Sequence, residues 1–115
     1  MSDLGRYGEQ LAQAYLEEHG LRVVETNYRF HHREIDIIAE EGDILVFCEV
    51  KTRRDAAFGA PEAALTPLKV RHIRRVAEAY LAKRAIRERQ CRFDVIGILM
   101  VNGVARVNHM RNAFW

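Results

Sequence analysis

Apolar residues recur along this chain first at helical and then at strand-like intervals. Residues 4–19 carry an apolar stripe of helical spacing, and Asp3 and Gly20 at its two ends are a typical cap and stop. Three shorter apolar runs predict strands, at residues 21–27, 35–39 and 44–50. The acidic turn 40–43 indicates a tight antiparallel hairpin, and the polar segment 28–33 is expected to be the turn into the second strand.

A loop and a second helix follow these strands. Residues 52–61 predict a loop longer than compact domains usually need, and such loops often carry function. Thr66 and Pro67 are a typical helix start, and we expect this helix to run to about Arg87. Its apolar residues form one stripe that is predicted to be buried: Leu68, Ile73, Val76, Ala77, Tyr80 and Leu81.

The last part of the chain returns to strand-like spacing. Residues 93–101 predict a strand that begins near Asp94, for which a structural role is the favoured interpretation, and residues 104–108 are expected to pair with it across Asn102-Gly103. The apolar tail 110–115 is expected to pack on the domain or against a partner. The predicted order is helix, three strands, helix and one or two strands, which indicates an α/β fold.

Length and composition restrict the class of protein. At 115 residues, 49% of them hydrophobic, the chain is expected to form one domain over residues 1–115. No apolar run approaches the roughly 20 residues that a membrane span needs, and residues 1–9 lack an apolar signal segment. Cys48 and Cys91 lack metal-ligand spacing and are expected to be free, buried thiols. These observations predict a cytoplasmic protein with no membrane partner.

The formal net charge of +2 hides an asymmetry along the chain. Residues 1–50 hold four Arg against eleven Asp and Glu, whereas residues 51–92 hold twelve Lys and Arg against four Asp and Glu. A basic segment after an acidic one is typical of a phosphate-binding surface beside a metal site. A solvated helix face with internal ion pairs explains the same pattern, and charge alone does not decide between them.

The strongest chemical signal is a set of charged residues inside the predicted hairpin. Asp36 interrupts one apolar run, and Glu49 and Lys51 stand at the end of the next. Residues two apart in a strand share a face, so Glu49 and Lys51 point the same way. Burying such charges costs free energy unless they have partners. The three are therefore either a structural ion pair and its neighbour or the lining of a reactive cleft.

This element order resembles the core of the restriction-endonuclease-like nucleases, the PD-(D/E)XK superfamily. Their active-site pattern is an Asp followed on the next strand by Glu/Asp-x-Lys, which Asp36, Glu49 and Lys51 match. Further motifs look like those of the bacterial YraN-type family, which is related to archaeal Holliday-junction resolvases. These motifs are Gly5-Arg6, Gly8-Glu9, Glu34-Ile35-Asp36, Val46 to Arg53, Gly59-Ala60-Pro61-Glu62-Ala63, Arg92-Phe93-Asp94-Val95 and Asn112-Ala113-Phe114. The resemblance implies a mixed central sheet flanked by helices.

The resemblance also implies a metal site. Asp36 and Glu49 would hold Mg²⁺ or Mn²⁺, with the Val50 carbonyl and the first-helix Glu9 as further ligands. The metal would polarise a phosphodiester and activate water, while Lys51 would orient that water or stabilise the developing charge. Arg33 stands where the family usually has Gly, and this departure affects the turn rather than the ligands.

Six basic residues are the candidates for binding nucleic acid, with DNA expected: Arg53, Arg54, Lys69, Arg71, Arg74 and Arg75. The leading hypothesis is a metal-dependent endonuclease acting on branched or structured DNA, and its relatives make a homodimer conceivable. The first alternative is a non-catalytic nucleic-acid-binding module that assists recombination or repair. The second is a structural component whose Glu49 and Lys51 face is covered by a protein partner.

Overall fold

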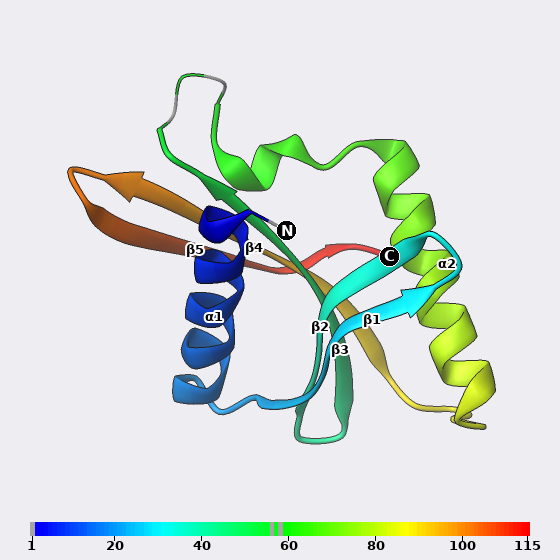
Figure 1. Ribbon diagram of the computed structural model, residues 1–115. Helices are drawn as coiled ribbons and strands as arrows, with labels where there is room; N and C mark the ends of the chain where they lie inside the picture. The colour runs from blue at the N-terminus through cyan, green and yellow to red at the C-terminus, as the bar shows by residue number, and fades with distance from the viewer. Residues whose placement is uncertain (1, 56, 58) are drawn as a thin grey trace.

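The computed structural model describes residues 2–55, 57 and 59–115, so Ala56 and Phe58 of the expected loop lie outside it. Five strands and two α-helices follow one another with a short 3₁₀-helix between them (Figure 1). Their bounds are α1 Asp3–Glu18, β1 Arg22–Phe30, β2 Arg33–Glu41, β3 Ile44–Arg53, η1 Pro61–Ala64, α2 Pro67–Lys83, β4 Cys91–Val101 and β5 Val104–Phe114. The expected α/β order, with two final strands, is confirmed.

The five strands form one mixed sheet in the order β1-β2-β3-β4-β5. Neighbouring strands are antiparallel except β3 and β4, which are parallel and are joined by the connection that contains α2. The hairpin expected between β2 and β3 is confirmed, and so is the hairpin that turns at Asn102-Gly103 between β4 and β5. Both tight turns contain a glycine with positive φ, Gly42 and Gly103.

The two α-helices cover opposite faces of the sheet (Figure 1). On β3, Val46 and Cys48 face α1 and pack with its Ala12 and Leu16, whereas Phe47 belongs to the cluster under α2. This alternation is the period of two that a strand imposes, and it buries an apolar layer on each face. Glu49 consequently points to the α2 face and Cys48 to the α1 face.

Three expected details of the helices are wrong. The cap of α1 is Ser2, whose Oγ accepts from the Gly5 amide, rather than Asp3. The α2 helix begins after Thr66 as expected but ends at Lys83, since the chain turns at Ala85 with a φ of 53°. Leu68, in the first turn of α2, is 53% exposed and does not belong to the buried stripe.

Several strands are longer than expected. β1 runs to Phe30 rather than ending at residue 27, because Tyr28 and Phe30 pack against the cluster under α2. β5 extends to Phe114, which stacks on Phe93 with ring centroids 5.0 Å apart. The tail therefore packs on the sheet as expected, apart from the terminal Trp115, which is 86% exposed.

Two further expectations concern cysteines and membranes. Cys48 and Cys91 are free thiols, the first buried and the second half-buried. Neither α1 nor α2 is long and apolar enough to cross a lipid bilayer.

Candidate functional site

Asp36 and Glu49, two of the predicted site residues, lie next to each other at the point where β2 and β3 separate. Backbone pairing of these strands starts at Glu41 and Ile44 and extends only to Ile37 and Cys48. Asp36 and Glu49 are the next residues on each strand, and their carboxyl groups come together where the pairing ends. The Asp36 Oδ2 accepts a hydrogen bond of 2.8 Å from the Val50 amide, which fixes the carboxylate against β3.

The two carboxyl groups interact strongly. Glu49 is only 3% exposed, and Asp36 is half-buried beside it. The pKa of Asp36 is raised to about 9, first by burial and then by the Glu49 carboxyl through a shared hydrogen bond and charge repulsion. The pair therefore holds less negative charge than two solvated carboxylates would, and a bound cation would relieve the repulsion.

Two lysines approach Glu49 from different elements. Lys51, two residues along β3, has its Nζ 3.9 Å from Glu49 Oε2. Lys69 Nζ lies nearer, at 3.2 Å from the same oxygen. Lys69 belongs to the first turn of α2, where its amide donates to the Thr66 hydroxyl that caps the helix. The docking of α2 on the sheet therefore brings a second ammonium group into the site.

Glu9 of α1 is held close to this pair by Asn27. The Asn27 side-chain amide donates hydrogen bonds of 2.9 Å to both Glu9 and Glu34. Burial raises the pKa of Glu9 despite the Asn27 hydrogen bond, and the charges of Glu34 and Glu49 raise it further. Glu9 thus lies within electrostatic range of Glu49, and its role as a metal ligand stays a prediction.

Asn27 has an unusual backbone for a residue inside a strand. Its φ is 51°, a left-handed conformation that asparagine tolerates better than most residues. The pairs Thr26 with Ile37 and Tyr28 with Ile35 place Asn27 opposite Asp36 on the neighbouring strand. This conformation lets one side chain of β1 bridge two carboxylates at the edge of the site.

The donor set fits a hard divalent cation. No described part of the chain gathers three or more His, Cys, Asp or Glu side chains in a metal-binding arrangement. Mg²⁺ is usually bound in proteins through one or two carboxylates, with waters and substrate phosphates filling its other positions. Asp36 and Glu49 supply two such carboxylates side by side, which meets that requirement. The Val50 carbonyl stays a prediction.

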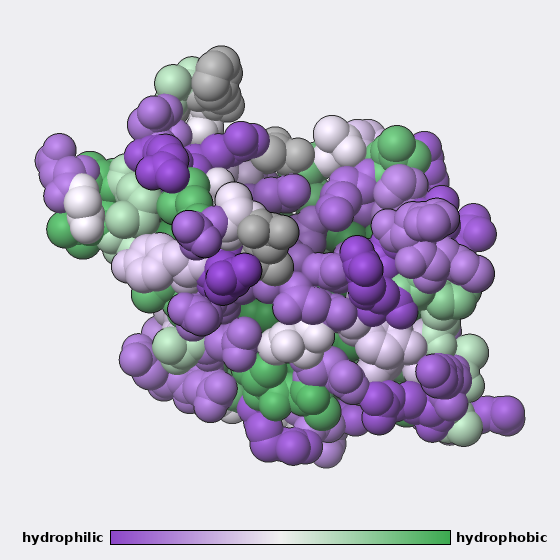
Figure 2. Space-filling view, in the orientation of Figure 1, coloured by the Kyte–Doolittle hydropathy of each residue, from purple (hydrophilic) through white to green (hydrophobic). Residues whose placement is uncertain are grey.

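The predicted basic residues divide into two groups. Arg53 ends β3 and Arg54 follows it, whereas Lys69 and the three arginines 71, 74 and 75 lie on the first half of α2. Apart from Lys69, none of the six forms an ion pair within residues 2–55, 57 and 59–115. The surface that faces the viewer around α2 is mostly hydrophilic (Figure 2).

The lowered pKa of His72, a residue of α2, indicates positive charge on this helix surface. This pKa is lowered by partial loss of hydration and then by the positive charges of four residues: Arg33, Lys69, Arg71 and Arg75. Arg33 begins β2, so the tip of the β1–β2 hairpin adds a charge to the helix surface (Figure 1). The basic surface, defined by these residues and His72, adjoins the acidic pair through Lys69.

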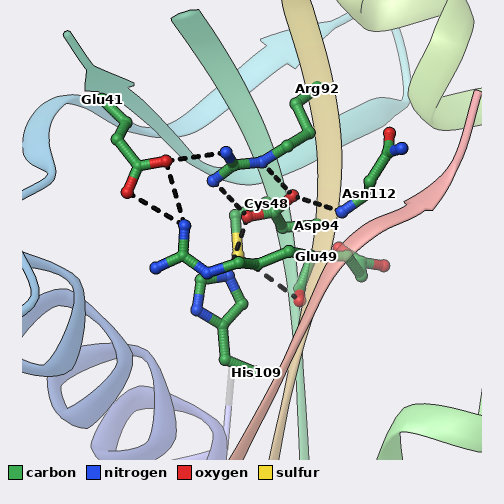
Figure 3. Close-up of polar contacts among 8 residues, drawn as sticks. Glu41, Cys48, Glu49, Arg92, Asp94, His109 and Asn112 are labelled. Carbon is green, nitrogen blue, oxygen red and sulfur yellow. Dashed lines mark hydrogen bonds and ion pairs between the residues drawn. The ribbon is translucent and has the colours of Figure 1, made fainter.

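A second charged cluster lies on the opposite face of the sheet, centred on Asp94 (Figure 3). Asp94 is fully buried. It accepts hydrogen bonds from the Arg92 guanidinium, from the backbone amide of Asn112 and from His109 Nε2 at 2.7 Å. Burial alone would raise the pKa of Asp94, but the His109, Arg92 and Asn112 hydrogen bonds lower it overall. The His109 and Asn112 bonds join β5 to β4, which supports the structural role expected for Asp94.

Three members of the site were not predicted in their roles: Lys69 as a partner of Glu49, Asn27 as a bridge, and Arg33 as part of the basic surface. Lys69 was expected only to contact nucleic acid. Its basic character was visible in the sequence, but its distance from Glu49 depends on how α2 docks. Nothing in the sequence marked Asn27, whose role requires the left-handed backbone.

Residues 8–98 match the model of a family described as uncharacterised protein family UPF0102. A UPF0102 protein of Syntrophomonas wolfei is 40% identical over 112 residues, which cover 97% of each chain. One of Geobacter sulfurreducens is 46% identical over 112 residues, covering 96% of this chain and 88% of the relative. Another, of Beutenbergia cavernae, is 46% identical over 109 residues, covering 94% of this chain and 92% of the relative.

Proposed function

This chain belongs to the uncharacterised protein family UPF0102, and on that premise we propose that it is a divalent-metal-dependent endonuclease. Its substrate would be structured or branched DNA. The observation that carries the proposal is the pairing of Asp36 with the buried Glu49 where β2 and β3 separate, with Lys51 beside them. A purely structural role would not require two mutually repelling carboxylates at a place where the strand pairing ends.

The proposal assigns the chain to the PD-(D/E)XK nucleases. Three features support this assignment: an Asp on one strand, Glu-x-Lys on the next, and a mixed sheet with a helix on each face. The pattern is short, but here its residues are also adjacent in space. That adjacency supports the assignment, because a chance match in the sequence would not require the three residues to lie together.

Each residue would have a defined task in phosphodiester hydrolysis. Asp36 and Glu49 would hold Mg²⁺ or Mn²⁺, which when bound supplies a Lewis acid for the phosphate and for the attacking water. Lys51 would stabilise the negative charge that develops on the phosphate oxygens. The Val50 amide holds Asp36 in place, so the carboxylate is oriented before a substrate arrives.

The basic surface would bind the sugar–phosphate backbone of the substrate. Arg71 and Arg75 contact no carboxylate among the residues described, which leaves them available to phosphate oxygens. Contacts of this kind depend on salt and carry no sequence information. Recognition of DNA shape is therefore the expected mode.

A non-catalytic nucleic-acid-binding module is the second candidate, and the ion pair of Lys69 with Glu49 favours it. An ammonium group at 3.2 Å already neutralises part of the charge that a metal would use. This function predicts salt-dependent DNA binding that survives Asp36→Asn, together with no cleavage of any substrate.

A cleavage assay separates the two functions. Junction, flap and linear duplex DNA are incubated with the protein in Mg²⁺, in Mn²⁺ and in EDTA. We expect cleavage that needs the metal and that Lys51→Met reduces by about 100-fold or more. Lys83→Met, in the last turn of α2 and outside the site, is the matched control and should cleave like the wild type. If no DNA is cut, or if Lys51→Met cuts normally, the nuclease proposal is wrong.

A further inference from the structure

Glu49 has two ammonium partners, and the nearer one is outside the Glu-x-Lys pattern. We propose that Lys69 is an exchangeable counter-ion of Glu49. In the metal-free protein it neutralises Glu49, and when a divalent cation binds it moves to a phosphate of the nucleic acid. This inference rests on the proposed metal site, and it adds a device that couples metal binding to substrate binding.

The burial of the two groups is suited to such an exchange. Glu49 is 3% exposed and is held within β3, whereas the Lys69 side chain is 37% exposed. The backbone of Lys69 is fixed by the Thr66 cap, but a flexible stem of four methylene groups separates that backbone from the ammonium. The charge of Lys69 can therefore leave the carboxylate without any change in α2.

Electrostatics make the exchange necessary when a cation binds. Lys69 Nζ lies 3.2 Å from Glu49 Oε2, the oxygen that also faces Lys51. A divalent cation on this carboxylate would repel an ammonium at such a distance. Metal binding therefore has to open the Lys69 to Glu49 pair, and this opening weakens the affinity of the free protein for metal.

The released ammonium would then need a new anion. Lys69 forms no second ion pair within the described part of the chain, and its neighbours on the basic surface are cations. A phosphate of bound DNA is the partner that this surface would bring within reach. Metal would thus strengthen DNA binding and DNA would strengthen metal binding by the same factor, as thermodynamic linkage requires.

Arg71 offers a matched comparison with Lys69, because it carries the same charge and also lies near the start of α2. It contributes to the positive potential at His72 as Lys69 does, yet it makes no contact with Glu49 in the described structure. A general effect of charge would act through both residues. A competition for Glu49 would act through Lys69 and not through Arg71.

The first test measures Mn²⁺ affinity by calorimetry for the wild type, Lys69→Met, Lys69→Arg and Arg71→Met without DNA. Lys69→Met should bind Mn²⁺ at least about fivefold more tightly, because the competing cation is gone. Arg71→Met should change the affinity by less than about twofold, and Lys69→Arg, which keeps the charge, should resemble the wild type. A merely structural role for Lys69 would weaken metal binding instead.

The second test follows DNA binding in EDTA with Glu49→Gln in two backgrounds. Removing the Glu49 charge releases Lys69, so DNA should bind more tightly in the wild-type background. The gain should largely disappear in the Lys69→Met background, because no ammonium is left to release. An equal gain in both backgrounds would overturn the exchange.

The outcomes separate this inference from the proposed function. If the wild type binds Mn²⁺ but Lys69→Met binds it equally or more weakly, the exchange is wrong and the metal site stands. If neither protein binds Mn²⁺, both the exchange and the metal site are wrong. Tighter binding by Lys69→Met alone supports the exchange.

Discussion

Gly8 of α1 packs against Thr52 of β3 so closely that a β-carbon on Gly8 would overlap the Thr52 hydroxyl. Gly8 is buried, and the next residue is Glu9, which accepts from Asn27 and whose pKa the Glu49 charge helps to raise. Glycine is required here by the close approach of helix to strand rather than by an unusual backbone angle. The same contact that seats α1 on the sheet therefore also places Glu9.

Gly8→Ala tests this contact directly. Alanine favours a helix more than glycine does, but the overlap with Thr52 should outweigh that gain and cost about 1 to 3 kcal/mol of unfolding free energy. Thr52→Ala removes the overlapping hydroxyl and should restore part of the loss in the double variant. Urea unfolding of the four proteins measures the coupling. Strictly additive effects would show that the contact does not limit the approach of α1.

Asp36→Asn should stabilise the metal-free protein. Burial and the Glu49 charge oppose ionisation of Asp36, so at neutral pH folding has to protonate this carboxyl at a cost in free energy. An uncharged Asn avoids that cost, and its side-chain oxygen still accepts from the Val50 amide. We expect a gain of at least about 1 kcal/mol at neutral pH in EDTA, measured by urea unfolding. Asp43→Asn, in an exposed turn, is the control and should change the stability by less than about 0.5 kcal/mol. A loss of stability in Asp36→Asn would contradict the account of the site.

The buried Asp94 should control the stability in acid. Its pKa lies below the ordinary value in the folded protein, so its ionised form stabilises the fold at pH values above the unfolded-state pKa of about 3.9. This contribution is lost as the pH falls through the folded-state pKa. The stability of the wild type, measured by urea unfolding between pH 7 and pH 2, should therefore decline in this window.

Asp94→Asn should lose this acid dependence. At pH 7 it should cost about 3 to 5 kcal/mol, because Arg92 is left without its buried partner. The difference from the wild type should narrow below about pH 4, where Asp94 of the unfolded chain begins to take up a proton while Asp94 of the folded protein is still ionised. Glu41→Gln, which alters a more exposed member of the same cluster, should cost less than about 1 kcal/mol. If the wild type and Asp94→Asn differed in unfolding free energy as much at pH 2 as at pH 7, the lowered pKa would not belong to Asp94.

The basic surface makes a prediction about salt. Arg71→Ala and Arg75→Ala should each weaken DNA binding and reduce the slope of log affinity against log salt by about 1. Arg84→Ala is the control, because Arg84 follows the end of α2 and pairs with Glu25 at 2.6 Å. Fluorescence anisotropy with labelled duplex at several salt concentrations gives the slopes. Equal slopes for all variants would place the DNA elsewhere.

Local patterns were sufficient to predict the order of elements and the hairpin that carries Asp36 and Glu49. The hairpin between β2 and β3 follows from two apolar runs and an acidic turn, and it brings Asp36 beside Glu49. Thr66 and Pro67 marked the start of α2 because capping is a local interaction. These features depend on residues that are close in the sequence.

Features that depend on distant contacts were missed. β1 extends to Phe30 because Tyr28 packs edge-on against Tyr80, with ring centroids 5.0 Å apart, and this contact requires α2 to be in place. Lys69 reaches Glu49 for the same reason. His109 reaches Asp94 only through the pairing of β4 with β5. No periodicity within one segment contains this information.

The central claim is that Asp36 and Glu49 together bind a divalent cation. It is tested most directly by calorimetric titration of the protein with Mn²⁺ and Mg²⁺, comparing the wild type with Glu49→Gln and with Glu78→Gln, an exposed carboxylate on α2. We predict one saturable site in the wild type and in Glu78→Gln, and a loss of at least about tenfold in affinity in Glu49→Gln. No binding by the wild type, or equal binding by Glu49→Gln, would contradict the claim.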